Sequence, residues 1–372
     1  MKKPLRIILS GGGTGGHIYP AVAVAEALKR RFGEAVELLF VGAEGKMEME
    51  KVPALGYRIV GLPIAGLQRR LEWRNLLVPF KVLRSLRLAK RTIRDFGADL
   101  VVGFGGYASA PVLKAAQRMG VPTIIQEQNS YAGVTNKLLA KRAHRICTAY
   151  EGMGRFFPQE KIVLTGNPLR GRFAQEEADR AEALAHYGFT AELPVILVVG
   201  GSLGTRSMNE MMKAWIVRTE GKAPVQVIWQ TGKYYEAEMQ QFLREHPAPH
   251  IWQGSFIERM DHAYAAADVV VSRSGACTVS ELCLVAKPVV FIPSPNVAED
   301  HQTKNAQALA AKGAALLVPD NRCRDEAMER ALALAADREA LAAMRRNIAA
   351  LAKPRAAEEI VDEICNILDE KA

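Results

Sequence analysis

The chain has 372 residues, of which 49% are hydrophobic and 24% charged, and its formal net charge is +9. This length allows two domains of ordinary size, and the composition is that of a globular protein. No apolar run approaches the roughly eighteen residues of a membrane-spanning helix, and glycine interrupts the opening "MKKPLRIILSGGG" too early for a signal peptide. The five cysteines form no C-x-x-C pair, so we expect reduced thiols in a cytoplasmic protein.

The charge is unevenly distributed along the chain. Residues 1–168 carry 26 Lys and Arg against 12 Asp and Glu, whereas the remainder carries 23 against 28. The first half is therefore strongly basic and the second mildly acidic. Such asymmetry predicts an anionic partner for the first half, and nucleic acid and anionic lipid headgroups are the two candidates.

A glycine-rich loop follows the first predicted strand, where "LRIILS" runs into "GGGTGGH" and an alanine-rich helix. Gly11-x-Gly13-x-x-Gly16 satisfies the dinucleotide-binding pattern, but the next strand ends in Gly42 without the usual acidic residue. His17 stands where a P-loop has lysine, which argues against a nucleoside triphosphate. A dinucleotide and a sugar–lipid pyrophosphate both stay open, because bare N–H groups at a helix N-terminus suit any phosphate.

The two halves of the chain repeat one plan. "LRIILSGGGTGG" in the first half corresponds to "PVILVVGGSLGT" in the second, and "ADLVVGFGG" corresponds to "ADVVVSRSG". Each pair continues to a proline and a short apolar strand, in "VPTIIQEQN" and "KPVVFIPSP". Strands that alternate with helical patterns in this way predict an α/β protein of two doubly wound, parallel-sheet domains in tandem.

We place the boundary of these Rossmann-like domains near "LTGNPLRGRF", where strand character gives way to Gly-Asn-Pro. The expected domains are 1–167 and 168–351, facing each other across a cleft. A C-terminal helix at about 352–372 is expected to pack back on the first domain. Ligands of open parallel sheets bind outside the carboxyl ends of the strands, so the glycine loops mark the predicted sites.

Eight motifs occur in order along the chain: "GGTGGH", "GFGGY", "EQN", "GNPLR", "GGSLG", "SFIERM", "SRSGACTVSE" and "HQTKNA". In these motifs, and over nearly its whole length, the sequence resembles the MurG family of bacterial glycosyltransferases. The resemblance implies the two-domain GT-B fold and an inverting transfer of N-acetylglucosamine from UDP-GlcNAc to lipid I, which yields lipid II for peptidoglycan. It also implies that the first glycine loop faces the acceptor and the diphosphate, not a nicotinamide.

Most candidates for binding the nucleotide sugar lie in the second half. "SRSGACTVSE" is a glycine turn that opens a helix, whose N–H groups suit a diphosphate, and Glu281 can accept both hydroxyls of a ribose. The guanidinium of Arg170 can hold phosphate oxygens in a bidentate fork. The resemblance adds the backbone of Ile257 as a reader of uracil. The donor-binding candidates are Arg170, Ser202, Ile257, Ala276, Cys277, Thr278, Val279, Ser280, Glu281, Gln302 and Asn305.

Candidates for the acceptor side lie in the first half. The attacking hydroxyl must lose a proton, and His17, at the start of the first helix, suits this because imidazole titrates near neutral pH. Glu127 in "IIQEQN" is the alternative base. The remaining acceptor-side candidates are Thr14, Gly15, Gly16, Asn129 and the loop residues Gly103, Gly105, Gly106 and Tyr107.

The chain contains no D-x-D triplet, the paired carboxylates with which metal-dependent transferases hold a divalent cation. We therefore expect no metal and no cofactor. Helix N-termini, glycine N–H groups and Arg170 are expected to neutralise the departing diphosphate.

Residues 66–96 hold nine Lys or Arg against two acids, interleaved with leucines, Trp73 and Phe80. This pattern, and an acceptor carried on a polyprenyl chain, predict peripheral attachment to the cytoplasmic face of the inner membrane. Residues 81–94 equally fit a core-packed helix with a solvated basic face. Nucleic acid fits less well because no recognised binding motif is present, and other cell-wall synthesis proteins are further candidate partners. The rival functions are an NAD-dependent oxidoreductase and a basic adaptor without catalysis.

Overall fold

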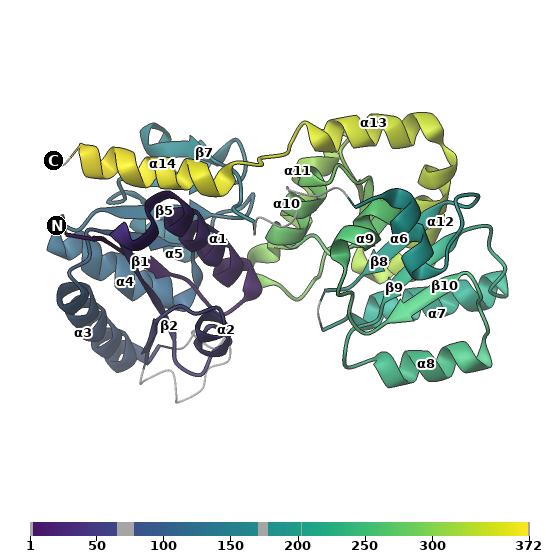
Figure 1. Ribbon diagram of the computed structural model, residues 1–372, viewed down its shortest axis with the longest axis horizontal. Helices are drawn as coiled ribbons and strands as arrows, with labels where there is room; N and C mark the ends of the chain where they lie inside the picture. The colour runs from purple at the N-terminus through teal and green to yellow at the C-terminus, as the bar shows by residue number, and fades with distance from the viewer. Residues whose placement is uncertain (1–2, 65–77, 170–177, 202, 371–372) are drawn as a thin grey trace. The chain divides into compact units, whose positions relative to one another are not determined.

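The computed structural model describes residues 3–64, 78–169, 178–201 and 203–370. The chain divides into two compact units: unit 1 is Met1–Arg170 with Arg355–Ala372, and unit 2 is Gly171–Pro354. Each unit is built on a parallel sheet covered by helices (Figure 1). The predicted α/β class with two doubly wound sheets is therefore confirmed.

Unit 1 alternates strands and helices in chain order, as the sequence pattern predicts. Its strands are β1 Leu5–Ser10, β2 Val36–Ala43, β3 Ile59–Leu62, β4 Leu100–Gly103, β5 Thr123–Glu127, β6 Arg145–Thr148 and β7 Ile162–Leu164. Its helices are α1 Gly15–Phe32, α2 Glu48–Ala54, α3 Val78–Phe96, α4 Gly106–Met119, α5 Val134–Ala140 and α14 Ala356–Asp369. The strands lie in the order β3-β2-β1-β4-β5-β6-β7.

Unit 2 repeats this plan, with strands in the order β10-β9-β8-β11-β12-β13. Its strands are β8 Val195–Val199, β9 Gln226–Gln230, β10 Ile251–Gly254, β11 Val269–Ser272, β12 Val289–Phe291 and β13 Leu316–Leu317. Its helices are α6 Arg180–Tyr187, α7 Arg206–Thr219, α8 Glu236–Glu245, α9 Met260–Ala266, α10 Ala276–Leu284, α11 His301–Ala310, α12 Cys323–Ala336 and α13 Arg338–Ala349. The reversal of strand order beside β1 and β8 puts a topological switch point in each sheet.

The core of unit 1 lies on both faces of its sheet, because alternate residues of a strand point to opposite sides. Ile7 of β1 belongs to the cluster formed with α1 and α14, whereas the next residue, Ile8, belongs to the cluster on the other face. Helix α14, yellow in Figure 1, lies beside α1 and contributes Ile360 and Ile364 to that core. The last residues of the chain are thus part of unit 1.

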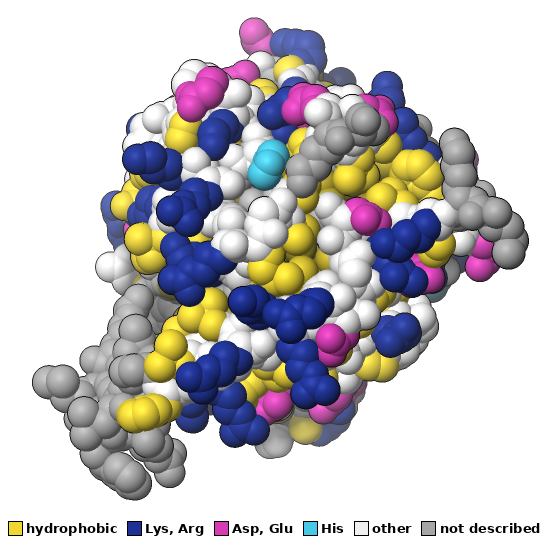
Figure 2. All heavy atoms as spheres, turned by 90° about the vertical axis from the view of Figure 1, so that its left-hand side faces the viewer, with side chains coloured by type: hydrophobic (Ala, Val, Ile, Leu, Met, Phe, Trp, Pro, Cys, Tyr) yellow, Lys and Arg dark blue, Asp and Glu magenta, His cyan; other side chains and the backbone are white. Residues whose placement is uncertain are grey.

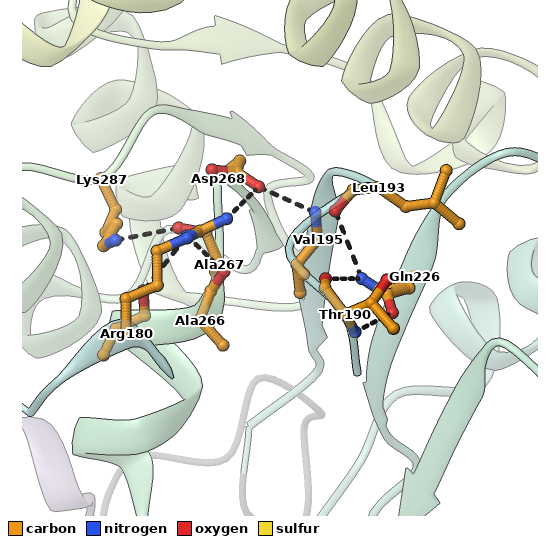
Figure 3. A network of polar contacts seen from close by, with 10 residues as sticks. Arg180, Thr190, Leu193, Val195, Gln226, Ala266, Ala267, Asp268 and Lys287 are labelled. Atoms are coloured by element: carbon orange, nitrogen blue, oxygen red, sulfur yellow. Dashed lines mark hydrogen bonds and ion pairs between the residues drawn. The ribbon is translucent and has the colours of Figure 1, made fainter. Parts of the chain in front are cut away.

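A repeated aspartate ties the central strands together at their amino ends. The carboxylate of Asp99 accepts from the N–H of Arg6 at 2.8 Å, and that of Asp268 accepts from the N–H of Val195 at 2.9 Å. Asp268 also accepts a hydrogen bond from the guanidinium of Arg180, with an N···O distance of 2.9 Å (Figure 3). The "AD" of each half therefore has the same structural role, at the sheet edge opposite the glycine loops.

Candidate active site

Two glycine loops of unit 1 pack directly on each other at the carboxyl ends of β1 and β4. A Cβ added to Gly106 would lie 2.3 Å from the carbonyl oxygen of Gly12, so only glycine fits there. Gly105 and Gly106 also have φ of +90° and +80°, which L side chains rarely adopt. The motifs "GGGTGG" and "GFGGY" thus form one surface, on which Tyr107 is exposed.

His17 lies at this surface, half-buried in the first turn of α1. Its Nδ1 is 3.0 Å from the carbonyl oxygen of Gly12 and 3.1 Å from the hydroxyl of Thr14. A carbonyl oxygen can only accept, so Nδ1 carries the proton and the lone pair of the neutral ring is on Nε2. A Cβ at Gly105 would come within 3.1 Å of that Nε2, so glycine at this position avoids a close contact with the ring. In this orientation the neutral ring can accept a proton at Nε2.

Glu127, the alternative base, is almost completely buried at the end of β5. Its carboxylate accepts from the N–H of Gly133 at 3.0 Å, from the side-chain amide of Asn136 at 2.8 Å, and from the backbone and side chain of Asn129. Burial raises the pKa of Glu127, and these hydrogen bonds oppose the rise. This carboxylate holds the loop that carries Asn129, and its lone pairs are already engaged.

Unit 2 has a pocket of about 780 Å³ at the carboxyl ends of β8, β11 and β12. Glycine turns at the N-termini of α7 and α10 open into it, so backbone N–H groups and the positive ends of both helices serve the pocket. The lining residues are Gly200, Gly201, Gly204, Thr205, Arg206, Ser207, Tyr235, Arg273, Gly275, Thr278, Ser294, Pro295, Asn296, Gln302 and Asp320. Such a surface suits a phosphorylated ligand.

Two arginines bring positive charge to the pocket. Arg273 pairs with Asp320 at 2.7 Å and donates to the hydroxyl of Ser207 at 2.9 Å, so its guanidinium is held in one orientation. Arg206 begins α7 and lies 5.8 Å from the ring of Tyr235. Asp320 is the only acid among the described residues that line the pocket, and Arg273 compensates its charge.

Glu281 lies in the second turn of α10, half-buried beside the buried Tyr264, whose hydroxyl donates to it at 3.4 Å. Desolvation raises the pKa of Glu281 to about 7, and the tyrosine hydrogen bond counteracts only part of the rise. Among the described residues Tyr264 donates to this carboxylate, whose other lone pairs can accept from hydroxyl donors. Ile257, the candidate uracil reader, is buried just before α9.

The other candidates of unit 2 divide into two groups. Thr278 and Gln302 line the pocket, and Gln302 accepts from the N–H of Ser294 at 2.9 Å. Asn305 is fully buried and donates to the carbonyl of Ser274, which orients the turn before α10 and keeps this amide away from the pocket lining. Val279 and Ala276 are also buried, and Cys277 is half-buried. The hydroxyl of Ser280 donates to the backbone carbonyl of Ala276. Arg170 and Ser202 lie outside the described residues.

No cluster of three His, Cys, Asp or Glu side chains with metal-binding geometry occurs among residues 3–64, 78–169, 178–201 and 203–370. In the same part of the chain, no helix is both long and apolar enough to cross a bilayer.

Comparison with known proteins agrees with the sequence resemblance. Family models for the N-terminal and C-terminal domains of glycosyltransferase family 28 match residues 7–148 and 195–360. A curated relative from Parabacteroides distasonis is 53% identical over 366 residues, covering 98% of this chain and 99% of the relative. Its name is UDP-N-acetylglucosamine--N-acetylmuramyl-(pentapeptide) pyrophosphoryl-undecaprenol N-acetylglucosamine transferase. The chain belongs to the MurG family of glycosyltransferase family 28.

Other MurG-family proteins extend the likeness. A relative from Bacteroides fragilis with the same name is 50% identical over 364 residues, covering 98% of this chain and 96% of the relative. The crystal structure of Acinetobacter baumannii MurG is similar with a TM-score of 0.81 at 31% identity, covering 98% of this chain and 100% of that one. The predicted GT-B fold is therefore confirmed.

The three charged residues among the described residues that line the pocket of this MurG-family chain were missed by the sequence analysis. Arg273 lies inside the motif "SRSGACTVSE", yet only the residues after its glycine were selected. Arg206 and Asp320 lie outside the motifs quoted. An arginine directly after a strand end is a signal that could have identified Arg273, whereas Asp320 depends on tertiary contact.

Proposed function

We infer that this chain transfers N-acetylglucosamine from UDP-N-acetylglucosamine to N-acetylmuramyl-pentapeptide pyrophosphoryl-undecaprenol, or lipid I, and so makes lipid II. The observation that carries this function is the 53% identity to a transferase of that name over almost the full length of both chains. The surface formed by the two glycine loops of unit 1 and the phosphate-suited pocket of unit 2 support it independently.

We propose that the pocket of unit 2 binds the donor. The N-termini of α7 and α10, with Arg206 and Arg273, neutralise the diphosphate, so no metal is needed. Glu281 accepts from the ribose hydroxyls, and Gln302 contacts the sugar. Arg170, Ser202 and the backbone of Ile257 keep the diphosphate and uracil roles that the family resemblance implies.

We propose that unit 1 binds the acceptor and supplies the base. Nε2 of His17 takes the proton of the muramyl 4-hydroxyl while that oxygen forms a bond to the anomeric carbon. The bond from this carbon to the phosphate oxygen breaks at the same time, and UDP leaves with the electron pair. Attack opposite the leaving group inverts the anomeric centre and gives a β-1,4 linkage. The surface of Thr14, Gly15, Gly16, Asn129, Gly106 and Tyr107 contacts the acceptor, whereas the predicted acceptor residues Gly103 and Gly105 are buried and only shape the loop.

Thermal-shift titration of the full chain with UDP, UDP-N-acetylglucosamine and NAD distinguishes this function from its rivals. Both uridine nucleotides are expected to raise the melting temperature, because a ligand that binds only the folded state stabilises it. NAD is expected to leave it unchanged. Stabilisation by NAD alone would support an oxidoreductase instead.

We also propose that unit 1 attaches to an anionic membrane surface through α3. Six basic residues of this helix are exposed, beside Phe80 and Leu83, which are 72% and 51% exposed. The opposite side of the helix packs into the core of unit 1 through Ala89 and Ile93. Figure 2 shows Lys and Arg side chains spread over one face of the molecule, with hydrophobic side chains between them. Arg69, Arg70 and Arg74 of the predicted basic segment lie outside the described residues.

Replacing Lys81, Arg84 and Arg87 with glutamate is expected to release the protein from vesicles that contain acidic lipid. Each basic residue near the surface contributes about 1 kcal/mol, so the partition coefficient is expected to fall at least about a hundredfold at low salt. Activity on a detergent-soluble acceptor is expected to persist, and added salt is expected to release the unaltered protein too.

The matched control for this variant is Arg338, Arg345 and Arg346 to glutamate, on exposed positions of α13 in unit 2. It makes the same change in net charge at another place, and vesicle binding is expected to fall much less. Equal binding of the α3 variant and the unaltered protein would show that α3 is a solvated helix face only.

A further inference from the structure

Glu48, the first residue of α2, lies beneath the first glycine loop with its side chain fully buried. Its Oε2 accepts from the N–H of Gly13 at 2.9 Å, and its Oε1 accepts from the N–H of Ala43 at 3.0 Å. Both oxygens therefore face backbone donors, a pattern that fits the ionised carboxylate. The N–H of Gly13, which a dinucleotide-binding loop would offer to a phosphate, is occupied by a protein carboxylate.

Two glycines make the room for this carboxylate. A Cβ added to Gly12 would lie 2.0 Å from Oε1 of Glu48, and a Cβ added to Gly42 would lie 2.5 Å from its Cγ. The absence of side chains at Gly12 and Gly42 thus serves a buried acid that belongs to the protein. Near the end of this second strand, where a dinucleotide site has an acidic residue, Gly42 instead makes room for the side chain of Glu48.

The carboxylate and the imidazole of His17 contact opposite ends of one peptide group. The N–H of the Gly12–Gly13 peptide donates to Glu48, and the C=O of the same peptide accepts from Nδ1 of His17 at 3.0 Å. No cis peptide bond occurs in the part of the chain that the structure describes, and N–H and C=O of a trans peptide point in opposite directions. Hydrogen bonds in such a chain polarise and strengthen one another.

We propose that Glu48 is a positioning residue for His17 and acts through this single peptide group. By fixing the Gly12–Gly13 peptide, it fixes the carbonyl that holds the Nδ1 proton, which leaves the lone pair on Nε2 for the acceptor hydroxyl. Glu48 itself touches no substrate. The proposal rests on the function of His17 as base given above.

Glu48→Gln tests this positioning role, because glutamine keeps the shape but offers only one oxygen to two N–H donors. The kcat is expected to fall about tenfold, the lower end of the range seen when an outer partner that orients a functional group is changed. The KM for UDP-N-acetylglucosamine is expected to stay within about twofold, because the proposed donor pocket belongs to unit 2. The control is Glu50→Gln, an exposed acid of the same helix, which is expected to leave kcat unchanged.

A double-mutant cycle shows whether the effect passes through His17. In the His17→Ala background, adding Glu48→Gln is expected to change the residual kcat by less than about twofold. An equal loss in both backgrounds would overturn the proposal while leaving His17 as base. Full activity of His17→Ala alone would instead overturn the base assignment, and the proposal with it.

Nitrogen-15 NMR of the unaltered full chain, labelled at histidine, supplies a readout that does not depend on how a variant folds. At a pH where the ring is neutral, His17 is expected to be the Nδ1–H tautomer. In Glu48→Gln the Nε2–H tautomer is expected to appear. An Nε2–H tautomer in the unaltered protein would overturn the proposal, as would an unchanged tautomer together with an unchanged kcat in Glu48→Gln.

Discussion

Replacing His17 with alanine is expected to lower kcat by about 10²–10⁴-fold, the range that a positioned general base contributes. The reason is the geometry of its ring, whose Nδ1 is held by the carbonyl of Gly12 at 3.0 Å, so that Nε2 presents the lone pair. The KM for UDP-N-acetylglucosamine is expected to change little. Steady-state kinetics with lipid I or a short-chain analogue measure both quantities.

Two further variants complete this prediction. His144→Ala removes the other histidine of unit 1, an exposed residue just before β6, and is expected to keep full activity. Glu127→Gln is expected to lower the free energy of unfolding by about 1–3 kcal/mol, because an amide NH2 would face the N–H of Gly133 or Asn129. Most of its turnover is expected to remain. The opposite result would make Glu127 the base. In that case a folded Glu127→Gln variant would lose kcat by about 10²–10⁴-fold, and His17→Ala would remain active.

Replacing Glu281 with alanine is expected to raise the KM for UDP-N-acetylglucosamine at least about tenfold. The ribose hydroxyls would lose one or two charge-assisted hydrogen bonds, each worth about 1.5–3 kcal/mol. Isothermal titration with UDP measures the same loss without the acceptor. Asp320→Asn is a comparison variant that also removes an acid. Asp320 is paired with Arg273 in the pocket and is not proposed to bind ribose. An unchanged KM in Glu281→Ala would contradict the ribose assignment.

The affinity for UDP is also expected to depend on pH through Glu281. Desolvation raises the pKa of this carboxyl to about 7, so without bound UDP it takes up a proton as the pH falls below that value. The neutral acid accepts from hydroxyls less well than the carboxylate, so affinity is expected to fall from pH 8 to pH 6. Glu281→Gln is expected to bind more weakly and to lose this part of the pH dependence. If the affinity of Glu281→Gln for UDP showed the same pH dependence, that dependence would belong to another group.

Sequence patterns predicted the fold well because the fold depends on local signals that occur twice. A buried strand that runs into glycine, as at Ser10 and Val199, determines both a strand end and a helix start. The paired "AD" dipeptides were recognised as a repeat, although their role, the tie from Asp99 to Arg6 and from Asp268 to Val195, appeared only in the structure.

The site was predicted less completely, because residue type alone does not show which way a polar group faces. Glu127 and Asn305 were selected as chemistry-bearing residues of their motifs, yet both are buried and hold neighbouring loops through hydrogen bonds. Glu48 was not selected, because it comes five residues after Ala43 and outside every motif quoted. Its contact with Gly13 forms only when α2 folds back beneath the first loop.

The most direct test of the central claim is a transfer assay with UDP-N-acetylglucosamine, labelled in the sugar, and N-acetylmuramyl-pentapeptide pyrophosphoryl-undecaprenol. We expect one labelled sugar per lipid, one UDP released for each transfer, a β-1,4 linkage in the product, and the same rate with and without a metal chelator. Uridine nucleotides that bind while no label reaches the lipid, under conditions in which a MurG-family relative transfers it, would contradict the account.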